Sequence, residues 1–173
     1  MALDPRDMLF GYAEASLDVK PGRFAIPANL FAKMGGETRF RMTADPCERF
    51  LELRSEKAFL ALAERVTAAA PGLPPETAAD LITEYIAFSA EVQVDNALRL
   101  VVPKGMREVL GDDTELALVA VGDALRVWSL AKYREARKSR RTRLAEDYPK
   151  FVNVILGFPA PAAQRPEAGP AAE

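Results

Sequence analysis

A segment near the N-terminus returns later in the chain, and this duplication limits the folds that the chain can adopt. The first copy reads LDVKPGRFAIP over 17–27, and its relative reads VDNALRLVVP over 94–103. Asp18 and Asp95 are 77 positions apart, one more than the other matches, so the copies differ by one residue inside the turn. Self-similarity at a fixed offset is typical of one structural unit used twice. Four pairs are separated by 76 positions: Arg23 and Arg99, Pro27 and Pro103, Gly35 and Gly111, and Thr38 and Thr114.

Both copies predict the same succession of elements: strand, turn, strand, short helix, strand, turn, strand and longer helix. Alternation of apolar and polar residues indicates the strands, and apolar residues at helical spacing indicate the helices. The sequence therefore predicts an α+β fold with a mainly β core. Strands are expected at 12–17, 23–26, 38–43, 50–53, 92–94, 98–102, 115–121 and 125–128, and helices at 28–34, 55–70, 76–87, 103–110 and 132–148.

The PGLPP stretch at 71–75 breaks the chain and is the best boundary between the copies. It gives a first unit over 8–70 and a second unit over 76–150, joined by the linker 71–75. Units of about 70 residues expose much surface for their volume, so each is expected to need the other or a partner chain. The Pro- and Ala-rich segment 158–173 is predicted to be disordered.

The composition excludes several classes of function. The chain has no histidine, which removes the commonest general base and metal ligand, and its single Cys47 cannot form an internal disulfide. No pair of carboxylates has a spacing that suggests acid–base catalysis. No apolar run is long enough to cross a membrane, and the N-terminus is acidic where a signal peptide is basic. We therefore expect a cytoplasmic protein that is not an enzyme, with no metal, no other cofactor and no membrane partner.

The duplicated turns and their surroundings resemble the MraZ family, whose two units each belong to the AbrB-like swapped-hairpin fold. The family pattern is an Asp, three residues and an Arg, usually with Lys or Gln and then Gly just before the Arg. The second copy keeps this spacing over 95–99 but lacks the Gly, and the first keeps Lys20, Gly22 and Arg23 but has Pro21 inserted. The resemblance covers about residues 8–135, and its other matches are Phe10-Gly11, Ile26-Pro27, Val102-Pro103 and LRVWS at 125–129.

The resemblance implies two AbrB-like repeats of the double-split β-barrel type, with a helix after each. Members of the family are bacterial DNA-binding regulators that sit on the nucleoid. They assemble into rings, commonly octamers, and bind short direct repeats in the promoter of the operon for division and cell-wall synthesis. The implied role is transcriptional repression, with double-stranded promoter DNA and further copies of the chain as partners.

The turns contain the residue types that DNA binding requires. Cations at fixed positions contact phosphates and give affinity, and an Arg that reaches two acceptors on guanine gives sequence choice. A Gly lets the backbone approach a phosphate closely. The alternative is that each Asp pairs with its Arg only to hold the turn, and the two roles are compatible. The predicted DNA-binding residues are Lys20, Gly22, Arg23 and Arg99, and the predicted turn-structuring residues are Asp18 and Asp95.

Local charge favours the first copy as the DNA-binding one. Residues 18–54 contain seven Lys or Arg against five Asp or Glu, whereas residues 95–131 contain four against six. Arg39 and Arg41 correspond to Glu115 and Ala117 in the second copy. Lys20 and Arg23 are therefore the preferred contacts.

The run 132–143 holds seven basic residues and only one acidic residue, Glu135. Three interpretations are open: a solvated helix face, an extra phosphate-binding segment, or a contact to an acidic neighbour.

Two further interpretations compete with the regulator as a whole. The altered turns are also compatible with an oligomeric protein-interaction scaffold of the same fold that no longer reads DNA. An AbrB-like antitoxin is disfavoured, because such chains usually carry one unit and a toxin-binding tail.

Overall fold

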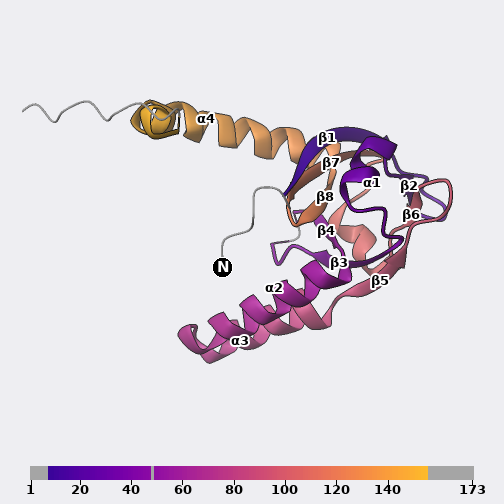
Figure 1. The fold of residues 1–173 in the computed structure, drawn as a ribbon, viewed down its shortest axis with the longest axis horizontal. Coiled ribbons are helices and arrows are strands. Elements are labelled where there is room, and N and C mark those ends of the chain that lie inside the picture. The colour runs from indigo at the N-terminus through magenta and orange to yellow at the C-terminus, as the bar shows by residue number, and fades with distance from the viewer. Residues whose placement is uncertain (1–7, 48, 156–173) are drawn as a thin grey trace, which may run out of the picture. The chain divides into compact units, whose positions relative to one another are not determined.

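A computed structural model describes residues 8–47 and 49–155 (Figure 1). The described residues up to Arg134 form one compact unit, and those from Glu135 onward form a second. The strands are β1 Leu9–Ser16, β2 Arg23–Ala25, β3 Arg39–Ala44, β4 Leu51–Arg54, β5 Ala90–Gln93, β6 Arg99–Val101, β7 Glu115–Gly122 and β8 Ala124–Ser129. The helices are α1 Ala28–Lys33, α2 Glu56–Ala69, α3 Pro75–Leu81 and α4 Leu130–Ile155, with 3₁₀ turns at Ala70–Gly72 and Lys104–Val109 and a π-helical segment at Ile82–Ala87.

Six of these strands form one antiparallel sheet in the order β1-β7-β8-β4-β3-β5. The strand that opens the first copy, β1, pairs with β7 of the second copy, and β5 pairs with β3. The centre of the sheet is the pairing of β4 with β8. The remaining strands, β2 and β6, form a separate two-stranded ladder. Each copy therefore supplies an edge strand to the other copy's part of the sheet.

The hydrophobic core lies where the sheet and the β2–β6 ladder meet. The predicted alternation in β3 is confirmed, because Phe40 and Met42 are buried while Arg39 is exposed. The predicted combination of β strands and helices is also confirmed, and the main sheet is antiparallel. The largest fully buried side chains are Phe24, Ile26, Leu30, Phe40, Met42, Leu51, Leu53, Leu100, Leu110, Leu116, Leu118 and Leu125.

Several elements differ from the sequence prediction in extent or type. The first strand begins at Leu9, and the segment after Pro103 is a 3₁₀ turn. The helix expected over 76–87 changes to π-helical geometry from Ile82 onward. The boundary proposed at 71–75 lies inside the first compact unit and stays a prediction. The predicted disordered tail, 158–173, lies outside the described residues.

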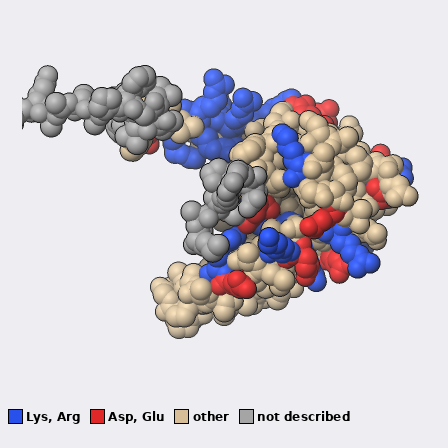
Figure 2. Space-filling model, in the orientation of Figure 1, with Lys and Arg blue, Asp and Glu red and all other residues tan. Residues whose placement is uncertain are grey.

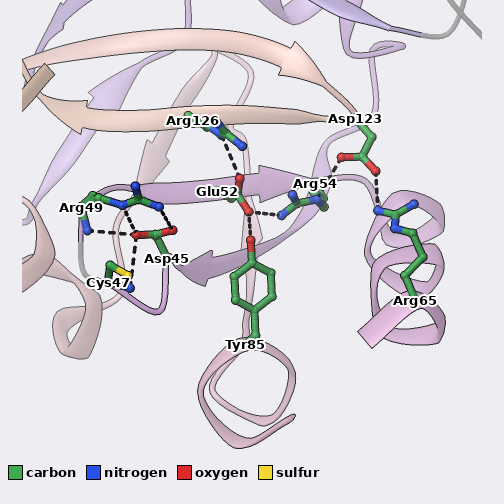
Figure 3. Close-up of polar contacts among 9 residues, drawn as sticks. All are labelled: Asp45, Cys47, Arg49, Glu52, Arg54, Arg65, Tyr85, Asp123 and Arg126. Carbon is green, nitrogen blue, oxygen red and sulfur yellow. Dashed lines mark hydrogen bonds and ion pairs between the residues drawn. The ribbon is translucent and has the colours of Figure 1, made fainter. Parts of the chain in front are cut away.

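A buried carboxylate joins the two copies at the centre of the sheet (Figure 3). Glu52 on β4 is 1% exposed and faces Arg126 on β8 in the strand register. Its Oε2 accepts a bond from Nη1 of Arg54 at 2.6 Å, and its Oε1 accepts one from Nε of Arg126 at 2.9 Å. The hydroxyl of Tyr85, on the π-helical segment, donates to Oε2 as well. A buried charge is tolerable only when it is paired and hydrogen-bonded, and Glu52 meets both conditions.

The ion pairs continue outward from Glu52. Nε of Arg54 lies 3.2 Å from Oδ1 of Asp123 in the β7–β8 turn. The other oxygen of Asp123 accepts a bond from Arg65 on α2 at 3.0 Å. The network thus connects both central strands to α2 and to the segment that follows α3 (Figure 3). This arrangement fixes the helices against the sheet.

We predict that Glu52→Gln destabilises the fold by about 3 kcal/mol, since the buried Arg54 loses its shorter ion pair and keeps only the 3.2 Å contact with Asp123. The measurement is urea unfolding followed by circular dichroism. Glu56→Gln is the matched control, because Glu56 pairs with Arg41 at 2.9 Å on the surface. That variant should cost less than about 1 kcal/mol. Equal losses in the two variants would contradict the central role of Glu52.

The same network predicts acid sensitivity. Burial raises the pKa of Glu52 and of Asp123, but the Arg partners outweigh burial, and the net pKa of each carboxyl lies below its ordinary value. Unfolded carboxyls have pKa values of about 4, so the unfolded chain binds more protons in acid. Stability should be complete above about pH 5 and fall as the pH drops through the folded pKa values. Urea titrations across this range should show a smaller decline for Glu52→Gln than for the unmodified chain.

Candidate nucleic-acid interface

The two predicted turns lie next to each other because β2 and β6 pair. In the ladder Arg23 faces Val101, Phe24 faces Leu100 and Ala25 faces Arg99. Phe24 and Leu100 are buried, so the alternate residues point outward. The side chains of Arg23 and Arg99 are therefore diagonal neighbours on one outward face, where Cβ atoms are about 7–8 Å apart.

Three of the predicted residues also line one groove on this face. The groove has a volume of about 390 Å³, and its walls include Asp18, Arg23 and Arg99. Glu14 on β1 contributes to the same groove. The surface thus combines two arginines with two carboxylates. The carboxylates can hold the arginines in position while the arginines bind a ligand.

The second turn is organised by Asp95. Its Oδ1 accepts bonds from the backbone N–H groups of Ala97 and Arg99, each at 2.9 Å. Its Oδ2 accepts from Nε of Arg99 at 2.9 Å and lies 2.8 Å from Nη2. The side-chain bond from Arg99 lowers the pKa of Asp95. A guanidinium has more N–H donors than this carboxylate uses, so Arg99 keeps donors for a further acceptor.

Leu98 adopts an unusual backbone conformation just before Arg99. Its φ is 58°, in the left-handed region where Gly22 lies at 84° in the first turn. A side chain costs about 1–2 kcal/mol in this region. Leu98 packs against the core, and this burial offsets the strain.

The first turn is held differently, mainly through its backbone. The N–H groups of Gly22 and Arg23 donate to the carbonyl of Asp18 at 2.7 and 3.1 Å. The carboxylate of Asp18 makes one longer contact, 3.3 Å, with Nη2 of Arg23. Nε of Arg23 is buried and has no hydrogen-bond partner among the described residues. Arg23 is consequently held less firmly than Arg99.

Arg107, a residue that the sequence analysis did not select, fixes the first turn from the second copy. Its guanidinium donates to the carbonyl of Val102 at 2.9 Å and also to the carbonyl of Pro21. Gly22 lies directly beneath it, and a Cβ on that residue would be 2.3 Å from Cζ of Arg107. Arg107 has no counterpart at the 76-residue offset, where Phe31 stands, so the repeat could not reveal it.

Several of the cations in residues 18–54 form ion pairs within the fold. Arg41 pairs with Glu56 at 2.9 Å, Arg49 pairs with Asp45 at 2.7 Å, and Arg54 is buried against Glu52. Lys20 is exposed beside the ladder. A charge count alone therefore does not show which cations of the first copy face outward, and each copy contributes one arginine to the outward face of the ladder.

Two other classes of site receive no support from the part of the chain that the structure describes. No group of three or more acidic or sulfur-bearing side chains there is placed to hold a metal ion. Within the same residues, no helix combines the length and apolar character needed to span a bilayer.

No protein-family model matches the chain, but individual curated proteins do. A protein of Nitrosomonas europaea is 30% identical over 130 residues, which are 73% of this chain and 84% of the relative. One from Mycoplasmopsis pulmonis is 28% identical over 125 residues, covering 72% and 81%. One from Syntrophomonas wolfei is 27% identical over 150 residues, covering 85% and 99%.

All three relatives are transcriptional regulators, and each carries the name MraZ. The chain belongs to the MraZ family. The predicted resemblance is thereby confirmed, and so is the expectation that the chain belongs to a class of regulators and not of enzymes.

We predict that Gly22→Ala destabilises the chain more than Gly36→Ala does. Both glycines have positive φ, but no atom lies within 4 Å of a Cβ built on Gly36. Each variant loses about 1–2 kcal/mol to left-handed strain. Gly22→Ala also displaces Arg107 from its two carbonyls and should lose about 1–2 kcal/mol more.

Urea unfolding of both variants gives this difference directly. In an Arg107→Ala background the two substitutions should cost the same. A difference that persists in that background would contradict the proposed contact between Gly22 and Arg107.

Proposed function

We propose that the chain binds double-stranded promoter DNA through the outward face of the β2–β6 ladder and acts as a transcriptional repressor. The observation that carries the proposal is that Arg23 and Arg99 lie on this face and line one groove. Membership of a family of transcriptional regulators supports it. Lys20 is exposed in the turn before β2 and adds a third cation to the proposed set.

The geometry suggests a different role for each of these residues. Asp95 positions Arg99 through bonds to both its side chain and its backbone, which is the preparation that a guanine contact requires. Gly22 presents a backbone without a side chain, and Lys20 and Arg23 supply charge for phosphate contacts. Because both arginines belong to one surface, the proposal uses both copies of the turn together. Arg23 and Arg99 then have two roles, since each pairs with an Asp of its own turn and each also contacts DNA.

We further propose that the fold is two AbrB-like swapped-hairpin units of the double-split β-barrel type. The strand order supports this proposal, since exchanging β1 with β5, β3 with β7 and β4 with β8 leaves the order unchanged apart from its direction. The ladder likewise pairs β2 with its counterpart β6. Such an arrangement places one turn from each unit on the same side of the molecule.

The proposed partner in solution is the chain itself, in a homo-oligomeric ring, with the octamer of the family as the working expectation. One ladder face offers only a few cations and would bind DNA weakly at physiological salt. Several faces that engage short direct repeats together would raise the affinity through avidity. We place the protein in the cytoplasm, on the nucleoid, at the promoter of the division and cell-wall genes.

We predict that Arg23→Ala combined with Arg99→Ala weakens binding to promoter DNA carrying short direct repeats by more than about tenfold, since a lost bidentate base contact alone costs about 1–3 kcal/mol. Fluorescence anisotropy over a range of salt concentrations measures the change. Arg65→Ala on α2 is the matched control and should retain affinity, because Arg65 pairs with Asp123 within the fold.

Sedimentation velocity should show the same oligomer for all three proteins. Unchanged DNA affinity in the Arg23 and Arg99 double variant would contradict the assignment of the DNA-binding site to the β2–β6 ladder. If the unmodified chain retained no fragment of its own genome at low salt, the interaction-scaffold alternative would replace the regulator.

A further inference from the structure

The second compact unit contains a helical segment with an unusual density of positive charge. Residues 136–145 lie within α4 and contain five basic residues and no acidic residue. Figure 2 shows Lys and Arg side chains crowded along the part of the molecule that α4 occupies in Figure 1. The basic residues are Arg137, Lys138, Arg140, Arg141 and Arg143, and this set is called the basic segment below.

Three of the five residues in the basic segment form no ion pair within the described part of the chain. Arg143 bonds to Ser139 at 3.2 Å, and Arg140 bonds to the carbonyl of Ala136 at 3.3 Å. No ion pair joins Arg137, Lys138 or Arg141 to any residue that the structure describes. Positions three and four apart are neighbours on a helix, so Arg137 and Lys138 both lie beside Arg141. Like charges at these spacings destabilise the helix, and a bound polyanion would relieve their repulsion.

The charge density of the basic segment matches that of duplex DNA. Arg137 and Arg143 are six residues apart, which corresponds to about 9 Å along a helix axis. Five positive charges lie within that length. Double-stranded DNA carries a negative charge about every 1.7 Å of its axis, or about five over the same distance.

The sequence of the segment argues against the other anionic surfaces. A helix that lies on a membrane needs an apolar face with large side chains opposite its charges. Residues 136–145 contain a single large apolar side chain, Leu144, and the exposed Tyr148 and Phe151 lie beyond the acidic pair Glu146 and Asp147. A protein interface is typically built on aromatic anchors, and residues 136–145 contain no aromatic side chain.

We propose that the basic segment of α4 is a second DNA-binding site, which contacts the phosphate backbone without reading sequence. The inference extends the proposed function, because it adds a contact outside the β2–β6 ladder. The ladder selects the promoter repeats, and the basic segment raises affinity for any duplex. Neutralising the segment therefore weakens all DNA binding equally, whereas changing the ladder removes the preference for repeats.

The test compares two variants of the full chain. The first is R137Q/K138Q/R141Q, which removes three charges and keeps good helix-forming residues. The second is R137K/R141K, which preserves all the charges at the same positions. The probe is a duplex of scrambled sequence without repeats, and affinity is measured against salt concentration. Far-UV circular dichroism verifies that both variants keep their helix content.

The glutamine variant should bind the scrambled duplex at least about tenfold more weakly, and the slope of log affinity against log salt should fall by about 2–3. The lysine variant should match the unmodified chain, since phosphate contacts need charge more than geometry. An unchanged affinity and slope in the glutamine variant overturns the proposal. Loss of binding to phosphatidylglycerol vesicles with unchanged DNA binding overturns it too, and assigns the segment to lipid.

This experiment tests DNA binding by the basic segment independently of promoter recognition by the ladder. If the unmodified chain shows no preference for repeats, the promoter function fails, while binding to the scrambled duplex still reports on the basic segment.

Discussion

The buried carboxylate of Glu52 is the interaction on which the arrangement of the sheet and its helices depends. It lies where β4 meets β8, the central one of the strand pairings between the two copies. An ionised group in this position is costly unless all its oxygens are bonded, and here Arg54, Arg126 and Tyr85 satisfy them. These partners come from three separate parts of the chain. Their convergence requires the central strands and the π-helical segment to be in place together.

The duplicated turns were predictable because their signal is local and repeated. The fixed offset identified Arg23 and Arg99 as equivalent, and the structure places them on one face of the ladder. Alternation likewise predicted that Phe40 and Met42 point inward. Such patterns depend on the geometry of a single strand or turn, and residues close together in the sequence determine that geometry.

The rest of the candidate site depends on contacts between residues far apart in sequence, which leave no local pattern. Arg107 reaches Pro21 across 86 positions. Glu52 lies between two leucines in an alternating strand, and alternation alone would place it in solvent. It is buried because Tyr85 and the charged neighbours cover that face of the sheet. A charge count is limited for a related reason, since it cannot show that Arg41 and Arg54 are already paired.

Because Glu52 faces Arg126 in the β4–β8 pairing, separate halves of the chain could not pair equally well with copies of themselves. If the chain were split between the copies, two first halves that paired through β4 in the same register would bring one Glu52 against another. Two second halves paired through β8 would set Arg126 against Arg126. Either homodimer would set like charges against each other at its centre, whereas one first half and one second half would restore the attraction. The two halves are therefore complementary in charge at this pairing. A single polypeptide keeps one copy of each half together.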